Sequence, residues 1–197
     1  MRDDGSAAAA RRRMTLISAG LELFGKNGFS GTTMRAVLRR TGLEARFFTE
    51  HFADMDSLLA AVYKQVIDEE AVVLHAAMAA TGCSTKDGVR AMLDTLTRWL
   101  EEAPGRARIK LREIALAGPE CRRQRQAALD TFAALMAESL PPGDDPDRRH
   151  ICIGLLAASE RLLAEWTQGG SQLTRERVVD LVMFLVESVW DRIENGR

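Results

Sequence analysis

The distribution of proline most constrains how this chain folds. All five prolines lie between residues 104 and 146, so the first 103 residues and the last 51 contain none. Proline disrupts helix interiors, and the proline-free stretches are rich in alanine, leucine, arginine and glutamate, which favour helices. Apolar residues recur there with a period near 3.6, while alternating β-branched patterns are scarce. We therefore predict an all-α protein.

Breaks at glycine, threonine, aspartate and proline divide the chain into helices. Asn27-Gly28 and Thr41-Gly42 are helix-ending pairs, and the segment from Pro141 to Pro146 is the strongest loop signal. About nine helices are expected. They cover about residues 8–26, 34–40, 44–51, 54–80, 85–102, 106–117, 119–140, 147–168 and 174–193. Thr32 or Thr33 is expected to cap the second of them, and a capping box from Ser84 to Asp87 the fifth.

Composition and motifs exclude several classes of protein. Hydrophobic residues make up 46% and charged residues 28%, which is typical of a soluble globular protein. No apolar run reaches the roughly 18 residues of a membrane span, and the start lacks the apolar segment of a secretion signal, so we expect a cytoplasmic protein. Cys83, Cys121 and Cys152 form no CxxC pair, and small buried thiols are the expected reading. We expect no metal, cofactor or catalytic residue; a helical enzyme is the least favoured alternative.

Residues 34–51 are predicted to form two short helices joined by a glycine-containing turn, which is a helix-turn-helix. Conspicuous residues surround them in a fixed order: Leu23-Phe24, Gly28-Phe29, Thr32-Thr33, Thr41-Gly42-Leu43, Phe52 and Leu58. In this order and spacing, residues 11–62 resemble the DNA-binding domain of the tetracycline-repressor (TetR) family. The segment from Gly42 to Asp54 is most similar to members with an Arg-Tyr-Phe-Tyr-Glu run in the recognition helix.

The resemblance implies three regions. These are a flexible tail over residues 1–10, a helix-turn-helix DNA-binding domain over 11–53, and a helical ligand-binding and dimerisation domain over 54–197. The chain departs from the family pattern at three positions: Thr49 replaces a phosphate-contacting tyrosine, Met55 a lysine, and Glu44 the usual Ser or Thr cap of the recognition helix.

Charge is divided unevenly along the chain. The net charge is −1, but residues 1–52 hold nine Lys and Arg against five Asp and Glu, while the remainder holds 18 against 23. The predicted DNA-binding end is therefore the basic end, as phosphate contact requires.

Residue chemistry suggests the DNA contacts. Arg46 is predicted to bind a base or phosphate, since arginine pairs bidentately with guanine; the alternative is an i,i+4 pair with Glu50. Phe47 either touches a thymine methyl or lies in the core, and the basic triplet 11–13 either reaches DNA or stays solvated. Solvent exposure alone is the alternative for the phosphate candidates. The predicted DNA-contacting residues are Thr33, Arg35, Ala45, Arg46, Phe47, Thr49 and His51.

The last two helices are apolar on nearly all sides, so one side is expected to pack on the chain itself and another on a second subunit. We predict a homodimer through a four-helix bundle; a monomer that buries this pair internally is the alternative. The predicted interface residues are Ile151, Gly154, Leu155, Ala158, Val178, Leu181, Val182, Leu185 and Val189.

The middle helices are predicted to hold a small-molecule effector, lipophilic or aromatic. The alternative is that the same Met and aromatic residues are ordinary core. The predicted ligand residues are Met92, Leu96, Trp99, Arg112, Phe132, Met136 and Trp166, with Glu113 beside Arg112 as a second polar group. The sequence thus predicts a ligand-responsive DNA-binding regulator, most simply a dimeric repressor of a palindromic operator. The competing interpretation is a helical ligand- or protein-binding module with a decayed DNA site.

Overall fold

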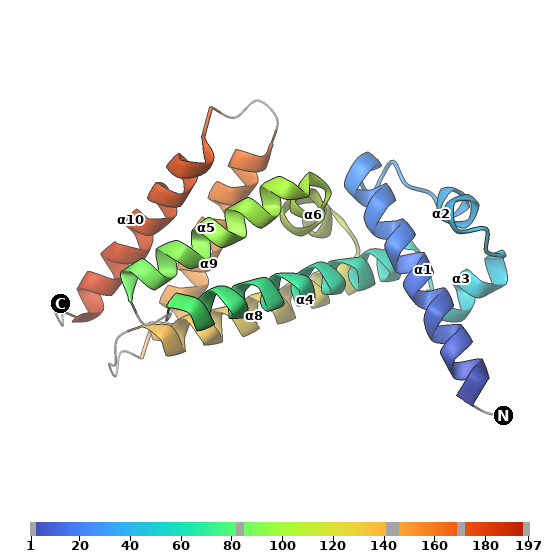
Figure 1. Cartoon of the computed structure of the whole chain (residues 1–197), viewed down its shortest axis with the longest axis horizontal. Helices are drawn as coiled ribbons and strands as arrows, with labels where there is room; N and C mark the ends of the chain where they lie inside the picture. Colours follow the sequence, from blue (N-terminus) through green and yellow to red (C-terminus); the bar gives the residue numbers. More distant parts are fainter. Residues whose placement is uncertain (1–2, 82–84, 141–145, 169–171, 195–197) are drawn as a thin grey trace. The chain divides into compact units, whose positions relative to one another are not determined.

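The computed structural model describes residues 3–81, 85–140, 146–168 and 172–194 (Figure 1). Every regular element in these ranges is helical, which confirms the all-α prediction. The elements are α1 (Asp3–Asn27), α2 (Met34–Thr41), α3 (Ala45–His51), α4 (Met55–Thr81), α5 (Lys86–Glu102), α6 (Pro104–Arg108), a π-helical turn (Ile109–Glu113), α7 (Ile114–Leu116), α8 (Pro119–Ser139), α9 (Arg148–Thr167) and α10 (Arg175–Glu194).

The chain forms two compact units. Unit 1 comprises Met1–Ile67 and Pro104–Arg125, and unit 2 comprises Asp68–Ala103 and Gln126–Arg197. The boundaries fall inside α4 and α8. Residues 104–125 therefore group with the N-terminal helices, although α5 precedes them in the chain. The predicted functional limits at residues 11, 53 and 54 stay predictions.

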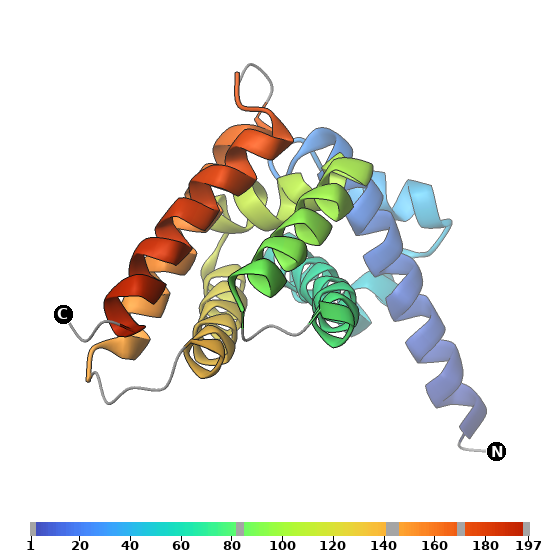
Figure 2. The ribbon, with the colours of Figure 1, turned by 60° about the vertical axis from the view of Figure 1, so that its left-hand side comes forward.

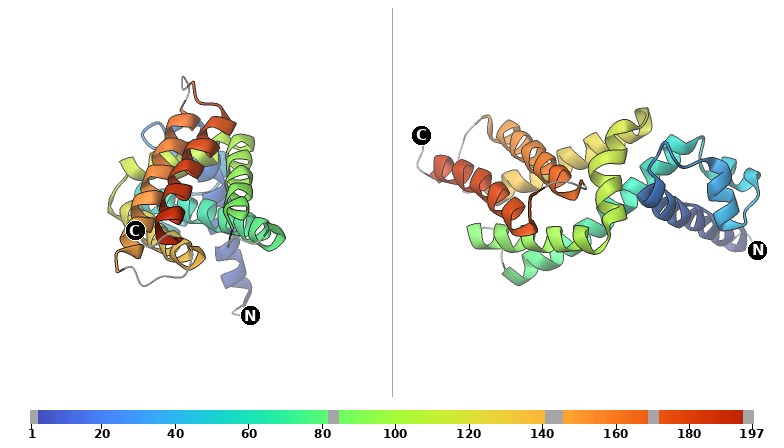
Figure 3. Two further views of the ribbon diagram at one scale, coloured as in Figure 1. Left: turned by 90° about the vertical axis from the view of Figure 1, so that its left-hand side faces the viewer. Right: turned by 90° about the horizontal axis from the view of Figure 1, so that it is seen from above.

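Unit 1 is built on α1, against which α2 and α3 pack (Figure 3). Its core is apolar and closed to solvent: Leu16, Phe24, Val37 and Phe48 are all 0% exposed. Tilted aromatic contacts join Phe24 to Phe29 and Phe48 to Phe52. The short helices α2 and α3 contribute few buried residues of their own, so this shared core is what holds them.

The first helix begins earlier in the structure than the sequence predicts. Helix α1 begins at Asp3 and runs through the four alanines from Ala7 to Ala10. Alanine has the highest intrinsic helix propensity, so a helix that nucleates against the core is extended by this run at little cost. The helix expected over about residues 8–26 therefore begins at Asp3, and the flexibility expected for residues 1–10 stays a prediction.

The single helix predicted over residues 106–117 is also corrected. A π-helical turn, Ile109–Glu113, separates α6 from α7. Helix α6 approaches the end of α1 through two glycines: a Cβ built on Gly25 would lie 2.9 Å from the Cα of Gly105. Only residues without side chains permit such close backbone contact.

Unit 2 has its own apolar core, in which α10 packs against α9 and α5 (Figure 2). Its buried cluster includes Leu93, Leu155, Val182, Met183 and Trp190. Ion pairs lie around this core and join α5 to α10: Lys86 pairs with Asp191, and Arg90 with Asp180. Thr85, rather than the predicted Ser84, caps α5 by accepting the Gly88 N–H at 3.1 Å; Ser84 lies outside the described residues.

A buried thiol and a carboxylate lie together in unit 1. Cys121 and Cys152 are buried, as predicted, whereas Cys83 lies outside the described residues. Burial raises the pKa of the Cys121 thiol well above its usual range, and the thiol donates to the Asp56 carbonyl. The Asp56 carboxylate accepts the Gly118 and Glu120 N–H groups at 2.7 and 3.0 Å, so it caps the start of α8. This thiol is therefore structural.

Candidate DNA-binding surface

Helix α2 begins and ends as its sequence predicts. The Thr33 hydroxyl accepts the Ala36 N–H at 3.2 Å and caps the helix, which decides between the two predicted threonines. Thr32 is instead buried, and its hydroxyl donates to the Gly28 carbonyl at 2.7 Å. At the other end Gly42 has a φ of 70° and closes α2 in the left-handed conformation.

Helix α3 lies after this turn, at the position of the predicted recognition helix. Its cap residue, Glu44, makes no side-chain cap hydrogen bond, as its poor capping chemistry predicts. Phe48 is 0% exposed and anchors the helix in the core of unit 1. The opposite face is open to solvent and presents Ala45, Arg46 and Thr49. An anchored helix with an exposed polar face is the geometry that reads a major groove.

Phe47 lies between two guanidinium groups. The Arg12 and Arg46 guanidinium carbons lie 4.6 and 4.8 Å from the ring centroid, within the range of cation–π attraction. Arg12 comes from α1, so this stack joins the frame of the unit to its exposed helix. The sequence suggested two roles for Phe47, a core residue or a DNA contact. In the structure its ring is half-buried and contacts both arginines.

Ion pairs around the stack differ from the alternative that the sequence suggested. Arg46 pairs with Glu44 at 3.1 Å rather than with Glu50, and both side chains are about two-thirds exposed. Glu50 lies 3.7 Å from Arg12 instead. Such exposed pairs contribute only about 0–1 kcal/mol to stability, so little free energy is lost when Arg46 exchanges Glu44 for another anion.

The remaining predicted contacts fall into two groups. Thr33 and Arg35 are exposed on α2, as a phosphate contact needs. The Thr49 hydroxyl is exposed but donates back to the Arg46 carbonyl at 3.1 Å, so it must rotate to reach a phosphate. His51 is half-buried, with its Nε2 shielded from solvent and its ring edge-on to Phe52. Of the predicted set, His51 and Phe47 are therefore the two residues that are only partly exposed.

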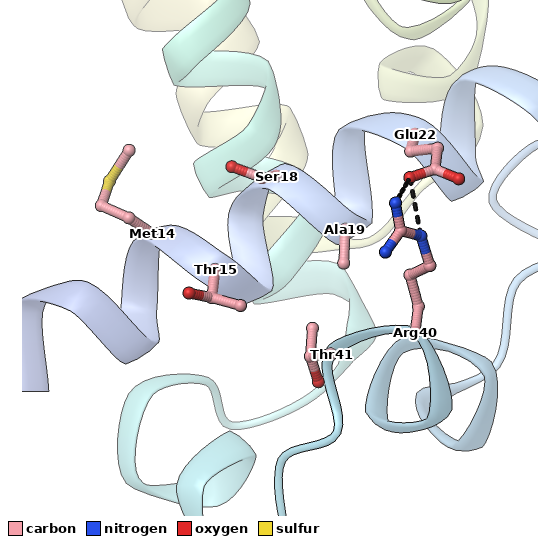
Figure 4. Close-up of a pocket in the computed structure, with 7 residues that line it drawn as sticks. All are labelled: Met14, Thr15, Ser18, Ala19, Glu22, Arg40 and Thr41. Carbon is pink, nitrogen blue, oxygen red and sulfur yellow. Dashed lines mark hydrogen bonds and ion pairs between the residues drawn. The ribbon is translucent and has the colours of Figure 1, made fainter.

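A surface hollow lies between α1 and α2 (Figure 4). Its volume is about 470 Å³, and it is lined by Met14, Thr15, Ser18, Ala19, Glu22, Arg40 and Thr41. Arg40 binds Glu22 across it, with Nε 2.9 Å from the carboxylate oxygen. This hydrogen bond lowers the pKa of Glu22, so both groups stay charged. Arg40 is therefore held by an ion pair within unit 1. None of the predicted effector residues lines this hollow.

Comparison with known proteins agrees with this geometry. Residues 16–62, which span α1 to the start of α4, match the family described as bacterial regulatory proteins, tetR family. The HTH-type transcriptional regulator BetI of Paraburkholderia phytofirmans is 22% identical over 181 residues, covering 92% of this chain and 80% of that protein. Residues 16–62 therefore form a domain of the TetR family. The family model describes regulatory proteins and the matched relative is a transcriptional regulator, which supports a role in transcription regulation rather than catalysis.

Solved structures share the fold of this chain. A TetR-like transcriptional regulator from Rhodococcus sp. RHA1 aligns with a TM-score of 0.67 and 20% identity, covering 94% of this chain and 97% of that one. The regulator FadR of Bacillus subtilis, in complex with stearoyl-CoA, aligns with a TM-score of 0.72 and 13% identity, covering 90% and 97%. The likeness therefore extends into the C-terminal helices, where the sequence resemblance stopped.

The predicted effector residues do not all lie in one unit. Leu96 and Trp99 are buried in α5, and Met92, Phe132, Met136 and Trp166 are half-buried; all six belong to unit 2. Arg112 is exposed, and it belongs to unit 1. Its neighbour Glu113 is 4% exposed and accepts the Phe29 N–H at 2.7 Å. The π-helical turn thus leaves Arg112 exposed and directs Glu113 to the turn after α1, and the predicted effector contact of Arg112 stays a prediction.

The predicted dimer residues also separate by burial. Leu155, Val178 and Val182 are at most 6% exposed in the single chain, so they belong to its own core. The other predicted positions are half-buried or open. Phe184, which was not among them, is 67% exposed on α10. Phe184 lies opposite the buried stripe of α10, and periodicity alone could not show which side of this helix is buried.

The described residues contain no cluster of three His, Cys, Asp or Glu side chains that could hold a metal ion. No helix among them is both long and apolar enough to cross a membrane.

Proposed function

We propose that this protein is a homodimeric repressor that binds a palindromic operator and releases it when a small-molecule effector binds. The observation that carries the proposal is the geometry of α3, which is anchored by the buried Phe48 and presents Arg46 to solvent. The basic end of the chain carries this surface. Two copies related by a two-fold axis would read two half-sites in successive major grooves.

Arg46 is proposed as the principal contact to a base. Its guanidinium is held by the Phe47 ring and by the exposed Glu44, which is a weak partner. Guanine offers two acceptors in a geometry that a guanidinium matches, so the exchange of Glu44 for guanine is favourable. Arg35 and Thr33 on α2 would contact the phosphates beside that groove.

Selection from random-sequence duplexes tests DNA recognition directly. We expect the protein to enrich a palindromic motif, and Arg46→Ala to bind the enriched duplex about tenfold or more weakly, since a bidentate contact is worth about 1–3 kcal/mol. The matched control is Arg123→Ala, which removes an equally exposed arginine from an exposed pair on α8. Equal binding by Arg46→Ala and the parent would refute the assignment. Lower transcription in vitro from a promoter carrying the motif tests repression.

Phe184 supports the proposed dimer. An exposed phenylalanine beside the half-buried Leu181 and Leu185 leaves an apolar strip on α10, and such strips mark association surfaces. We expect a dimer mass by light scattering at micromolar concentration, and a shift to monomer in Phe184→Glu. Val72→Glu, at an equally exposed apolar position on α4, is the control and should leave the mass unchanged. A parent mass near one subunit would exclude the dimer.

A lipophilic effector is proposed from the six apolar and aromatic positions of unit 2 and from the FadR structure with stearoyl-CoA. Long-chain acyl-CoA and free fatty acids are the first probes. We expect a bound probe to raise the melting temperature and to release the enriched duplex. Trp99→Ala should reduce both effects, because Trp99 contributes one of the two largest side chains of the set and is buried. Thermal shifts equal to the parent's in Trp99→Ala would remove this residue from the site.

One feature favours the alternative of a helical interaction module. Glu44 places a carboxylate on Arg46, and the Thr49 hydroxyl is bonded to its own helix, so two family contact positions are engaged without DNA. The same selection separates the two functions, because an interaction module would enrich no motif.

A further inference from the structure

The π-helical turn of unit 1 brings together two charged side chains five residues apart. In this turn the Ile114 N–H bonds to the Ile109 carbonyl, an i→i+5 bond. Residues three and four apart share a face in an α-helix, whereas a π turn brings residues five apart together. Accordingly, the Arg108 Nε donates to the Glu113 carboxylate at 2.8 Å. A regular α-helix over the same residues would separate them.

This pair binds the backbone of the turn between α1 and α2. The second Glu113 oxygen accepts the Phe29 N–H at 2.7 Å, and Arg108 donates through Nη1 to the Lys26 carbonyl at 3.0 Å. One contact satisfies a carbonyl at the end of α1, and the other satisfies an amide of the loop that leads into α2. Glu113 is 4% exposed, so its charge is balanced by these partners rather than by water.

The backbone opposite the pair is shaped to receive it. Gly28 has a φ of 76°, and a Cβ built there would lie 2.5 Å from the Arg108 Nη2 and 3.1 Å from the Glu113 Oε1. A side chain at Gly28 would therefore displace the guanidinium as well as strain the backbone. The Thr32 hydroxyl binds the Gly28 carbonyl from the other side, so the whole turn is fixed.

We infer that Arg108 and Glu113 are positioning residues for DNA binding: their ion pair holds the α1–α2 turn and thereby sets how α2 and α3 are presented. This inference rests on the proposed function. Neither residue touches DNA in this role. They act through Phe29 and Lys26, after which the chain passes through the Thr33 cap into α2. The placement of α2 and α3 is therefore set by residues 84 and 82 positions farther along the chain than their partners Phe29 and Lys26.

The test compares Glu113→Ala with Glu113→Gln. The alanine variant leaves the Phe29 N–H without its acceptor, whereas the glutamine variant retains an acceptor oxygen at the same place. We expect Glu113→Ala to bind the duplex enriched by the parent about tenfold or more weakly. Glu113→Gln should recover only part of that loss, because its amide oxygen can accept the Phe29 N–H but its NH2 group cannot accept from the Arg108 Nε. Hydrogen exchange of the Phe29 amide and of the α2 and α3 amides should rise in the alanine variant.

A general loss of stability is controlled by Leu93→Ala, which makes a cavity in the core of unit 2. At a temperature where all variants are folded, it should bind the duplex as the parent does. Unchanged affinity in Glu113→Ala, or an equal loss in Leu93→Ala, would overturn the positioning role. If the parent enriches no duplex, the proposed function fails on its own. Hydrogen exchange then decides the inference, and unchanged exchange in α2 and α3 would overturn it.

Discussion

Helices α2 and α3 of unit 1 and helix α10 of unit 2 are stabilised in different ways. The first two have 8 and 7 residues and bury one residue each within their own bounds, Val37 and Phe48. Helix α10 has 20 residues and buries six of them, from Val178 to Trp190. Both are too short to be stable alone and depend on the shared core of unit 1; α2 depends also on its caps and on the α1–α2 turn that distant residues hold. Helix α10 is stabilised mainly by the apolar surface area that it buries.

This difference explains why the two regions tolerate change differently. Apolar packing is non-directional and adjusts to modest changes of shape. A hydrogen-bonded turn has no such latitude, since a buried donor without its acceptor costs about 1–3 kcal/mol. A surface that must hold side chains in fixed positions therefore depends on directional hydrogen bonds as well as on apolar packing.

The largest expected effect separates the cores of the two units. Phe48→Ala and Trp190→Ala each remove a buried aromatic side chain, and each should cost about 3–5 kcal/mol of unfolding free energy. Hydrogen exchange should rise most in α3 for the first variant and most in α10 for the second. If Phe48→Ala raised exchange equally in α10, the two regions would unfold as one body and the comparison would be lost.

Two glycines sharpen the comparison within unit 1. Gly28 and Gly42 both have positive φ, 76° and 70°, but a Cβ on Gly42 would meet nothing within 4 Å. Gly42→Ala should therefore cost only backbone strain, about 1–2 kcal/mol. Gly28→Ala should cost the same strain plus the loss of the Arg108 contacts. Urea unfolding of both variants measures the difference, and equal losses would show that Arg108 adds nothing.

The smallest effect concerns acid pH and Asp56. Burial raises the pKa of this carboxyl, but hydrogen bonds from Cys121, Glu120 and Gly118 outweigh it, so the pKa lies below its ordinary value of 3.8. The stabilisation is therefore present above that value and is lost as pH falls through the lowered pKa. Asp56→Asn should be less stable at neutral pH and should lose less on acidification.

Asp130→Asn is the control for this measurement. Asp130 forms an exposed ion pair with Arg149, and such a pair contributes about 0–1 kcal/mol. Its unfolding free energy should follow that of the parent from pH 7 to pH 3. A pH profile of Asp56→Asn that is parallel to the parent's would exclude the cap of α8 as the source of acid sensitivity.

Much of unit 1 was predictable because its signals are local. Thr33, Gly42 and Asn27-Gly28 act on backbone groups within four residues, so capping chemistry located the ends of α1 and α2. The poor cap at Glu44 was predicted for the same reason. The helical extent of residues 3–10 was missed because the tail is polar at its start, although its alanines favour a helix.

The partners of charged residues were not predictable. Arg46 pairs with Glu44 rather than with Glu50, and Glu50 lies near Arg12 from another helix. Glu113, predicted for an effector site, binds the turn after α1. Surface and buried acids look alike in a sequence, and the π-helical turn that redirects Glu113 leaves no periodic signal of its own.

By itself the sequence determined the helical class, the helix-turn-helix and the basic N-terminal end, because these depend on residue types within one or two turns. The tertiary structure alone decided which residues hold the α1–α2 turn, and which side of α10 is buried. Contacts such as that between Phe29 and Glu113 join residues 84 positions apart. They exist only once the helices have packed, and many pairings are compatible with the same pattern of polar and apolar residues.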